Sequence, residues 1–188
     1  MTSWKNNNTL GTRRFVEEVS GLAVESRKVV AVNRLHLRKL VEDRIEEFGP
    51  NCDLNDIDVS QVTDMRNLFY ASEFNGDISE WDTSNVEDMS SMFTGSKFNG
   101  DISNWDVSNV RDMGWMFYGS EFKGDISGWN TSSVKYMEYM FAYSKFNRDI
   151  SGWNVSNVEN MRRIFEGSPL EGKEPGWYDP ALWNQDSY

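Results

Sequence analysis

A 24-residue sequence repeat extends along most of this chain. FNGDISEWDTSNVEDMSSMF (residues 74–93) returns as FNGDISNWDVSNVRDMGWMF (residues 98–117). The five units, with no insertion between them, are 58–81, 82–105, 106–129, 130–153 and 154–177. Each unit closes on a tryptophan: Trp81, Trp105, Trp129, Trp153 and Trp177. A half-copy starting at Asp53 precedes them, so the repeat region runs over 53–177. A fixed period of this length predicts copies that stack on one another.

A single unit cannot fold by itself. Its core side chains, about seven in number, would contribute roughly 10–20 kcal/mol if all were buried. Ordering the backbone of one unit costs on the order of 24–48 kcal/mol. Neighbouring units must complete the burial, so the repeated residues are predicted to form one continuous core. The last copy decays to LEGKEP at 170–175, as expected of a terminal unit.

Each unit has two halves with different patterns. In the first half, Val86, Met89, Met92 and Phe93 have the spacing of one face of a short helix. These helices are predicted to begin near a capping serine: Ser60, Ser84, Ser108, Ser132 and Ser156. They are predicted to end near a glycine with positive φ: Gly95, Gly119 and Gly167. In the second half, a turn is predicted to lead into an extended segment at 78–83.

An aspartate recurs in the turn of the second half. The column consists of Asp77, Asp101, Asp125 and Asp149. Stacked carboxylates repel one another, so each is expected to accept backbone N–H groups within its turn. Calcium takes about 6–8 oxygen ligands, whereas each turn supplies one carboxylate. We therefore predict no metal site and a fold that does not require calcium.

The residue types needed for common catalytic chemistry are scarce. The chain has one cysteine, Cys52, and one histidine, His36. An intrachain disulfide is impossible, and zinc sites built from His and Cys lack ligands. A triad hydrolase would need His36 as its base, yet its place in a charged helix predicts a solvated side chain. Candidate carboxylate pairs recur in every unit, whereas a catalytic dyad should be unique. We predict no enzyme activity, no catalytic residues and no cofactor.

Acidic side chains are concentrated in the repeats. Residues 1–48 carry nine basic and seven acidic side chains, a balance of +2, whereas residues 49–188 carry ten and 23, a balance of −13. Such a surface repels phosphate backbones, so direct nucleic-acid binding is not expected. It suits a basic protein partner, or solubility alone.

No membrane span is expected, because the longest apolar run, residues 29–32, is far shorter than the ~20 residues that a span needs. No apolar leader follows Met1. The predicted location is the cytoplasm if Met1 is the natural start, and the cell surface or the outside if the chain is part of a longer protein.

The flanks are predicted to cap the repeats. Residues 1–52 form the N-terminal cap, with a disordered start at 1–8, ambiguous residues at 9–26 and a strand in RKVVAV. Asn33 can cap a helix from Arg34 to Phe48 that stops at Gly49. One side of this helix would cover the first unit: Leu37, Leu40, Val41, Ile45 and Phe48. Residues 178–188 form the C-terminal cap or tail, and apolar residues there are expected to fold back: Trp177, Tyr178, Leu182 and Trp183.

Positions that differ between units are candidates for recognition. The position two after the repeated methionine reads Asn67, Ser91, Trp115, Tyr139 and Arg163. Exposed large aromatics are typical of interface anchors, although neighbouring helices would partly cover them in the alternative interpretation. The predicted protein-binding residues on the helix face of units three and four are Trp115, Tyr118, Tyr136 and Tyr139, with Asp112 and Glu138 at the rim.

The unit DVSNVRDMGWMFYGSEFKGDISGW (106–129) resembles the repeat of the BspA-like bacterial surface proteins, a relative of leucine-rich repeats. The same repeat occurs in mycoplasma surface lipoproteins and in proteins of gut and oral bacteria. The resemblance covers residues 53–168, and the segment 37–65 resembles the lead-in to the repeats of that family. It implies a β/α solenoid with a role in adhesion or protein recognition.

These observations predict an α/β fold, a right-handed β/α repeat solenoid of five 24-residue units between two caps. The predicted function is a non-enzymatic scaffold for protein–protein recognition, of the adhesion or host-interaction type. The alternative is a cytoplasmic acidic inhibitor or decoy, of the kind a phage could encode, that binds a basic or nucleic-acid-binding host protein. Salt separates the two, because a charge-driven decoy loses its partner steeply as ionic strength rises.

Overall fold

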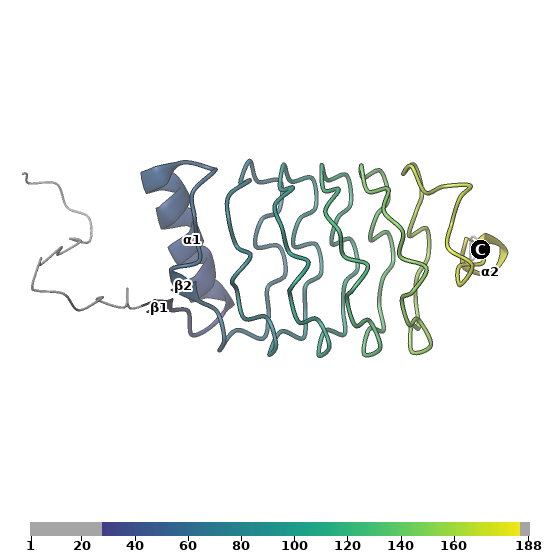
Figure 1. The fold of residues 1–188 in the computed structure, drawn as a ribbon, viewed down its shortest axis with the longest axis horizontal. Coiled ribbons are helices and arrows are strands. Elements are labelled where there is room, and N and C mark those ends of the chain that lie inside the picture. The colour runs from purple at the N-terminus through teal and green to yellow at the C-terminus, as the bar shows by residue number, and fades with distance from the viewer. Residues whose placement is uncertain (1–27, 185–188) are drawn as a thin grey trace, which may run out of the picture.

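The structure is a computed structural model that describes residues 28–184. Its regular elements in this range are β1 (Val29–Val30), α1 (Arg34–Phe48), β2 (Ile57–Asp58) and α2 (Pro180–Trp183). Between β2 and α2 the chain forms coils of turns that lie in a row, with α1 at one end and α2 at the other (Figure 1). The predicted disordered start (1–8), the ambiguous stretch 9–26 and the last residues of the predicted tail, 185–188, lie outside the described residues.

Backbone hydrogen bonds join each coil to the next. Isolated parallel bridges recur at the period of the repeat: Asp64–Asp88, Asp88–Asp112, Asp112–Tyr136 and Tyr136–Asn160. Beyond each bridge, alternate amides donate to carbonyls of the next coil at 2.7–2.9 Å: Met89 to Asp112, Ser91 to Gly114, Phe93 to Met116 and Gly95 to Tyr118. The amides in between bond within their own coil, as the N–H of Met92 does to the Met89 carbonyl. Each unit therefore depends on its neighbour for its backbone partners.

The short helices predicted in the units are wrong. Turns stand where they were predicted to begin, near Ser60, Ser84, Ser108, Ser132 and Ser156. The reason is the spacing of the coils. Packed helix axes lie about 8–10 Å apart, whereas the Phe93 and Phe117 rings of consecutive units have centroids 5.6 Å apart. The extended segment predicted at 78–83 is also wrong, since those residues form a turn and irregular backbone.

Two positions in each coil, four residues apart, have positive φ, and the amides of Ser91 and Gly95 at these positions donate ladder bonds. The first is the variable column of Asn67, Ser91, Trp115, Tyr139 and Arg163, with φ of 52–60°. The second holds Gly95, Gly119 and Gly167, whose positive φ is confirmed, but also Ala71 and Tyr143. Left-handed backbone is unfavourable for residues that carry a Cβ atom. The aromatic residues of both columns therefore occupy positions that would suit glycine or asparagine better.

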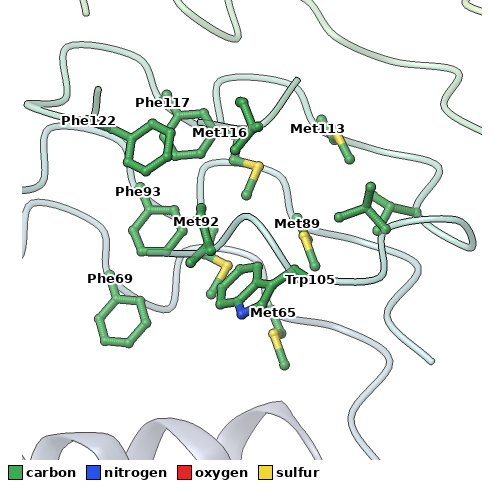
Figure 2. Close-up of a cluster of buried hydrophobic side chains, with 14 of the residues drawn as sticks. Met65, Phe69, Met89, Met92, Phe93, Trp105, Met113, Met116, Phe117 and Phe122 are labelled. Atoms are coloured by element: carbon green, nitrogen blue, oxygen red, sulfur yellow. The ribbon is translucent and has the colours of Figure 1, made fainter. Parts of the chain in front are cut away.

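Equivalent side chains stack into ladders through one core. The first phenylalanine ladder has ring centroids 5.4–6.1 Å apart and contains Phe69, Phe93, Phe117, Phe141 and Phe165. The second, with centroids 6.0–6.2 Å apart, contains Phe74, Phe98, Phe122 and Phe146. Met65, Met89 and Met113 follow one another from coil to coil in the same way (Figure 2). All of these residues are buried in a single continuous cluster.

The tryptophan column adds a hydrogen bond to its packing. The indole N–H of Trp105 donates to the Ile78 carbonyl of the preceding coil at 3.1 Å. The other tryptophans make the equivalent bond at 3.0–3.1 Å: Trp81 to Leu54, Trp129 to Ile102, Trp153 to Ile126 and Trp177 to Ile150. Phenylalanine could fill much of this space but has no such donor. Each tryptophan therefore fastens its coil to the one before it.

The repeated aspartates accept a backbone N–H from the residue two positions further on, as predicted. These bonds measure 2.8–3.0 Å for Asp53, Asp77, Asp101, Asp125 and Asp149. Hydrogen bonds from Ser103 hold the pKa of Asp101 below its ordinary value, although the neighbouring carboxylates oppose this. Asparagine can take the same part elsewhere in a unit, since Asn130 accepts the Ser132 N–H.

Asp101→Ala is expected to lower the free energy of unfolding at pH 7 by about 0.5–1.5 kcal/mol, because the Ser103 amide loses its acceptor. Asp101→Asn keeps an acceptor and should lose less. Because the pKa of Asp101 is lowered by folding, its contribution is present above the ordinary aspartate pKa and is lost as pH falls through the folded pKa. Denaturant melts at neutral and acidic pH test both points. An alanine variant as stable as the wild type at pH 7 would contradict the assigned role.

The first end of the row is covered by α1. Its range and its Asn33 cap are confirmed, with Asn33 accepting the His36 N–H at 3.0 Å. β1, which lies within the predicted strand, pairs in parallel with β2. The apolar side of α1 is buried or partly buried on the core through Leu37, Leu40, Val41 and Ile45. The prediction for Phe48 is wrong, because its side chain is 62% exposed.

The last coil is covered by the residues around α2. Tyr178 is buried, and Trp177 and Trp183 pack against the core as predicted. Leu182 does not, because it is 63% exposed.

Two side chains replace the carbonyls that a further coil would offer to the last one. Asn184 Oδ1 accepts the Arg163 N–H at 3.0 Å, and Glu171 Oε2 accepts the Gly167 N–H at 2.9 Å. The ladder therefore ends on side-chain oxygens in place of backbone carbonyls.

Candidate protein-binding surface

Four aromatic rings meet on the surface of the third and fourth units. The rings of Trp115 and Tyr139 stack with centroids 4.3 Å apart. Tyr118 contacts Trp115 at 4.8 Å, and Tyr143 meets Tyr118 edge-on at 5.5 Å. We call Trp115, Tyr118, Tyr139 and Tyr143 the aromatic cluster. Trp115 is 37% exposed and Tyr143 is 52% exposed, so the cluster is open to solvent.

The backbone ladder brings these rings together. Trp115 and Tyr139 occupy equivalent positions in neighbouring coils, and the Trp115 N–H donates to the Glu138 carbonyl at 2.9 Å. The Tyr118 N–H bonds back to the Trp115 carbonyl at 3.0 Å, which closes a tight turn between the two rings. Tyr143 sits in the glycine column of the fourth unit, with φ of 56°. A Cβ atom on Gly167 would clash with its ring, so the ring lies over the next coil.

Tyr136 lies apart from the aromatic cluster. It is 39% exposed, and its hydroxyl donates to Glu159 Oε2 at 3.3 Å. Lys135 binds the other oxygen of that carboxylate at 2.7 Å. The expectation that Tyr136 and Tyr139 share one helical face is wrong, because that helix is not formed. Tyr143, which was not among the predicted residues, joins the cluster instead. Its signal in the sequence is a tyrosine in a column of glycine and alanine.

Two half-buried carboxylates of the third and fourth units, Asp112 and Glu138, lie close to each other, and both are among the predicted rim residues. A Cβ atom added to Gly114 would lie 3.2 Å from Asp112 Oδ1 and from Glu138 Cδ, so both groups lean over the same glycine. Glu138 Oε2 is buried and has no hydrogen-bond partner within residues 28–184. Burial raises the pKa of Asp112 and of Glu138, and the charge of Asp112 raises that of Glu138 further.

Several cations of the molecule are already paired with other acids. The ion pairs are Arg66–Asp64 at 2.8 Å, Lys135–Glu159 at 2.7 Å, Lys145–Glu121 at 2.7 Å and Arg163–Glu166 at 3.5 Å. Across the described part of the chain, no ion pair involves Asp112 or Glu138. The charge of Arg66 lowers the pKa of Asp112, but it does not offset the effect of burial.

Glu138→Gln is expected to raise the free energy of unfolding at pH 7, by less than about 1 kcal/mol because solvent screens a half-exposed group. The pKa of Glu138 is raised by folding, so its ionised form costs stability at neutral pH. The wild type gains stability as pH falls through the folded pKa, and the gain is complete below the unfolded pKa. The advantage of the variant should therefore shrink between pH 7 and about pH 4. Melts that show it less stable than the wild type at pH 7 would contradict this.

The described residues contain no group of three or more His, Cys, Asp or Glu side chains placed to hold a metal ion. Cys52 is buried, which raises its pKa. His36 is partly exposed, and its Nδ1 accepts the Val32 N–H at 3.4 Å. Independence from calcium and the lack of enzyme activity stay predictions.

Neither helix of the described range is long and apolar enough to cross a bilayer.

Comparison with known proteins places most of the chain in a protein family. Two overlapping segments, residues 37–141 and 116–173, match the family described as "Mycoplasma protein of unknown function, DUF285". Among curated proteins none matches. Among solved structures none matches. The two segments together include α1, the row of coils and the whole aromatic cluster, and they cover well over half of the sequence. The chain therefore belongs to the DUF285 family of Mycoplasma proteins.

Proposed function

We propose that the chain is a non-enzymatic repeat solenoid that recognises another protein through the aromatic cluster, and that its units are BspA-like relatives of leucine-rich repeats. The observation that carries this proposal is the exposed aromatic cluster itself. Trp115 and Tyr139 stand at positions that Asn67 and Ser91 fill in other units. The fold tolerates small polar residues there. Trp and Tyr are enriched among the residues that dominate binding energy at protein interfaces.

Backbone strain supports a role outside folding. Trp115, Tyr139 and Tyr143 have φ of 55–60°, a conformation that costs about 1–2 kcal/mol for a residue with a side chain. The phenylalanine and tryptophan ladders already fill the core without these rings. These aromatic residues do not complete the core, and their positive φ is unfavourable. We therefore expect their role to be contact with another molecule. A partner protein is the kind of contact that exposed aromatic rings favour.

The rim of the cluster suits recognition. Glu166 accepts the Tyr143 hydroxyl at 2.8 Å, and Glu138 adjoins Tyr139 in the chain. An apolar centre surrounded by polar groups is the usual anatomy of a protein interface. The proposed role is of the adhesion or host-interaction type. A surface or secreted location for such a role is part of this proposal.

The acidic inhibitor or decoy is the second candidate, and the charge balance of −13 in residues 49–188 favours it. It would use charge spread over the repeats, whereas the first proposal uses one aromatic site. Raising the salt concentration should release a partner held by spread charge and should retain one that is anchored on the rings.

The test replaces Trp115 and Tyr139 by serine, because a serine, Ser91, occupies the equivalent position in the second unit. Proteins are captured from the cells of origin on wild-type protein and on the double variant, and affinities are then measured with the purified partner. The affinity should fall at least about 30-fold, as for two interface anchors. The melting temperature should be unchanged or slightly raised, because the substitutions remove no core contact and serine is less strained than a bulky residue at positive φ.

Tyr70→Ser is the matched control. Tyr70 is an exposed tyrosine in the equivalent position to Tyr118 but lies two units away from it, and its loss should leave binding unchanged. A double variant that binds like the wild type would refute the proposed surface. A double variant that melts far below the wild type would show that the two rings are structural.

A further inference from the structure

We infer that a hollow between the last two units binds the C-terminal carboxylate of a polypeptide whose last residue is apolar. The hollow has a volume of about 250 Å³ and is lined by side chains from residues 147–150 and 170–175. No residue of the aromatic cluster lines it, so this is a second site that goes beyond the proposed function. The inference follows from the cations of the hollow, from its unused hydrogen-bond donors and from its apolar lining.

Both cations of the hollow stand at positions where the other units have a different kind of residue. Lys173 occupies the position that the repeated aspartates hold in the earlier units. Arg148 occupies a position that is glycine in the first three units. A Cβ atom on Gly124, the equivalent residue of the third unit, would lie 2.6 Å from the Phe122 ring, so the coil has to adjust to carry a side chain at 148. Two changes toward positive charge, in neighbouring units, therefore meet in one hollow.

The charges of these two side chains are not used within the described part of the chain. Across residues 28–184, neither Arg148 nor Lys173 forms an ion pair. The charge of Arg148 lowers the pKa of Asp125 without pairing with it. The Arg148 Nε–H donates to the Lys123 carbonyl at 2.9 Å, which fixes the guanidinium and leaves its terminal N–H groups available.

An exposed asparagine adds a third donor to the hollow. In earlier units the equivalent residues, Asn75 and Asn99, each accept an N–H of the next coil at 2.7–2.8 Å. The N–H that would reach Asn147 is that of Glu171, and it donates to the Ser168 carbonyl instead. The decayed sequence of the last unit therefore leaves the Asn147 side chain without a partner among the described residues, at the edge of the hollow.

These groups select an anion. Arginine and lysine side chains only donate, and a guanidinium matches the two oxygens of a carboxylate with paired N–H groups. Asp149 is the acid among the lining residues, and its Oδ1 accepts the Ser151 N–H at 2.9 Å. Two bases and one acid give the lining a balance of +1, whereas residues 49–188 together have a balance of −13. An anion finds complementary charge here in an otherwise acidic region.

The apolar lining decides which anion fits. Ile150, Leu170 and Pro175 line the hollow beside the donors. Leu170 stands one unit beyond Phe146 in the second phenylalanine ladder and fills less space than a phenylalanine would. Phosphate would leave these apolar groups without a contact, whereas the last residue of a polypeptide presents an apolar side chain next to its carboxylate. Pockets for drug-sized ligands measure about 300–1,000 Å³, so this smaller hollow fits the end of a chain, a group that proteins commonly capture.

The direct test uses N-acetyl-leucine as the probe and the full chain labelled with ¹⁵N. Saturable shifts are expected for the side-chain amide signal of Asn147, which is assigned by its disappearance in Asn147→Ser. N-acetyl-leucinamide lacks the charge and inorganic phosphate lacks the apolar part, so each should bind several-fold more weakly. Equal binding of either compound overturns the inference. Free leucine that binds more tightly than the probe would assign the hollow to an amino acid instead of a chain end, which also overturns it.

Arg148→Gly restores the usual residue of its column and should weaken binding of the probe several-fold. Its melting temperature should be unchanged or raised, because glycine suits this position. Lys173→Asp restores the usual acid and should weaken binding more, since it reverses a charge. Lys123→Asn is the matched control, because it replaces an exposed cation outside the hollow by the residue that Asn99 places in the same column. Equal weakening by Arg148→Gly and Lys123→Asn would mean that net charge alone attracts the probe, and the assigned site would be wrong.

The double variant with Trp115→Ser and Tyr139→Ser distinguishes this inference from the proposed function. It should bind N-acetyl-leucine like the wild type, because no residue of the aromatic cluster lines the hollow. A double variant that loses the probe contradicts a separate second site. A wild type that does not bind the probe refutes this inference and leaves the proposed function standing.

Discussion

Trp105→Ala is expected to lower the free energy of unfolding by about 3–5 kcal/mol, the range for emptying a large aromatic site. Trp105 is almost fully buried in the middle of the row, and its ring stacks on that of Trp81 at 6.3 Å. The substitution opens a cavity that touches neighbouring coils. It also leaves the Ile78 carbonyl without the indole N–H that it accepts at 3.1 Å. Denaturant melts with a fixed slope would measure the loss.

Two further variants separate the parts of this effect. Trp105→Phe keeps most of the volume and removes the donor, so it should cost about 1–2 kcal/mol. Trp177→Ala acts on the terminal, partly buried member of the same column and should cost less than Trp105→Ala. A loss below about 1 kcal/mol for Trp105→Ala, or an equal loss at both positions, would show that the column does not hold the coils together.

The shared core could be predicted from the sequence, and so could the packing of both caps except at Phe48 and Leu182, which are exposed. Because every unit repeats the same positions, a residue that is apolar in all copies has to be buried between coils. Met89 and Met113 illustrate this, since both are fully buried in the shared core. The cap helix was predictable for a different reason. Asn33, a run of helical spacing and Gly49 mark its two ends, and they act within the chain without help from neighbouring units.

The local backbone of the units could not be predicted in the same way. Val86, Met89, Met92 and Phe93 have a spacing that fits a helix, but all four are also buried in a coil of turns that contains no helix. What decides between the two is the partner of each amide. The Met89 N–H bonds to Asp112 in the next coil, which is a contact between residues 23 positions apart. Periodicity within one unit contains no information about that contact.

The candidate surface, too, could be predicted only in part from the sequence. Trp115 and Tyr139 could be found because they break the small and polar pattern of their column. Tyr136 was grouped with them through an assumed helical turn, and the structure places it beside Glu159 instead. Tyr143 was missed because its column is one in which glycine is expected for backbone reasons. Once a column is known to have positive φ, a bulky residue in that column can be recognised in the sequence as a candidate for binding.

Removal of residues 177–188 is expected to destabilise the whole row of coils and to make the protein self-associate. The deletion takes away Tyr178, which packs edge-on against Phe165 at 5.3 Å, and Trp177, which donates to the Ile150 carbonyl. Burial of two large aromatic side chains corresponds to roughly 3–6 kcal/mol. The melting temperature should fall accordingly, by about 2–4 °C for each kcal/mol in a chain of this size.

Self-association is expected because the deletion also opens the end of the ladder. Asn184 goes with the deleted segment, so the Arg163 N–H loses the oxygen that takes the place of a next coil. An uncovered row of backbone donors beside an apolar face is a template for pairing with another chain. As a matched control, Leu182→Ala changes an exposed residue of the same segment and keeps Asn184 and the aromatic cover, so it should behave like the full chain. Light scattering and melting of the deletion and of the control decide the matter. A deletion that stays monomeric and melts like the full chain would mean that the last coil needs no cover.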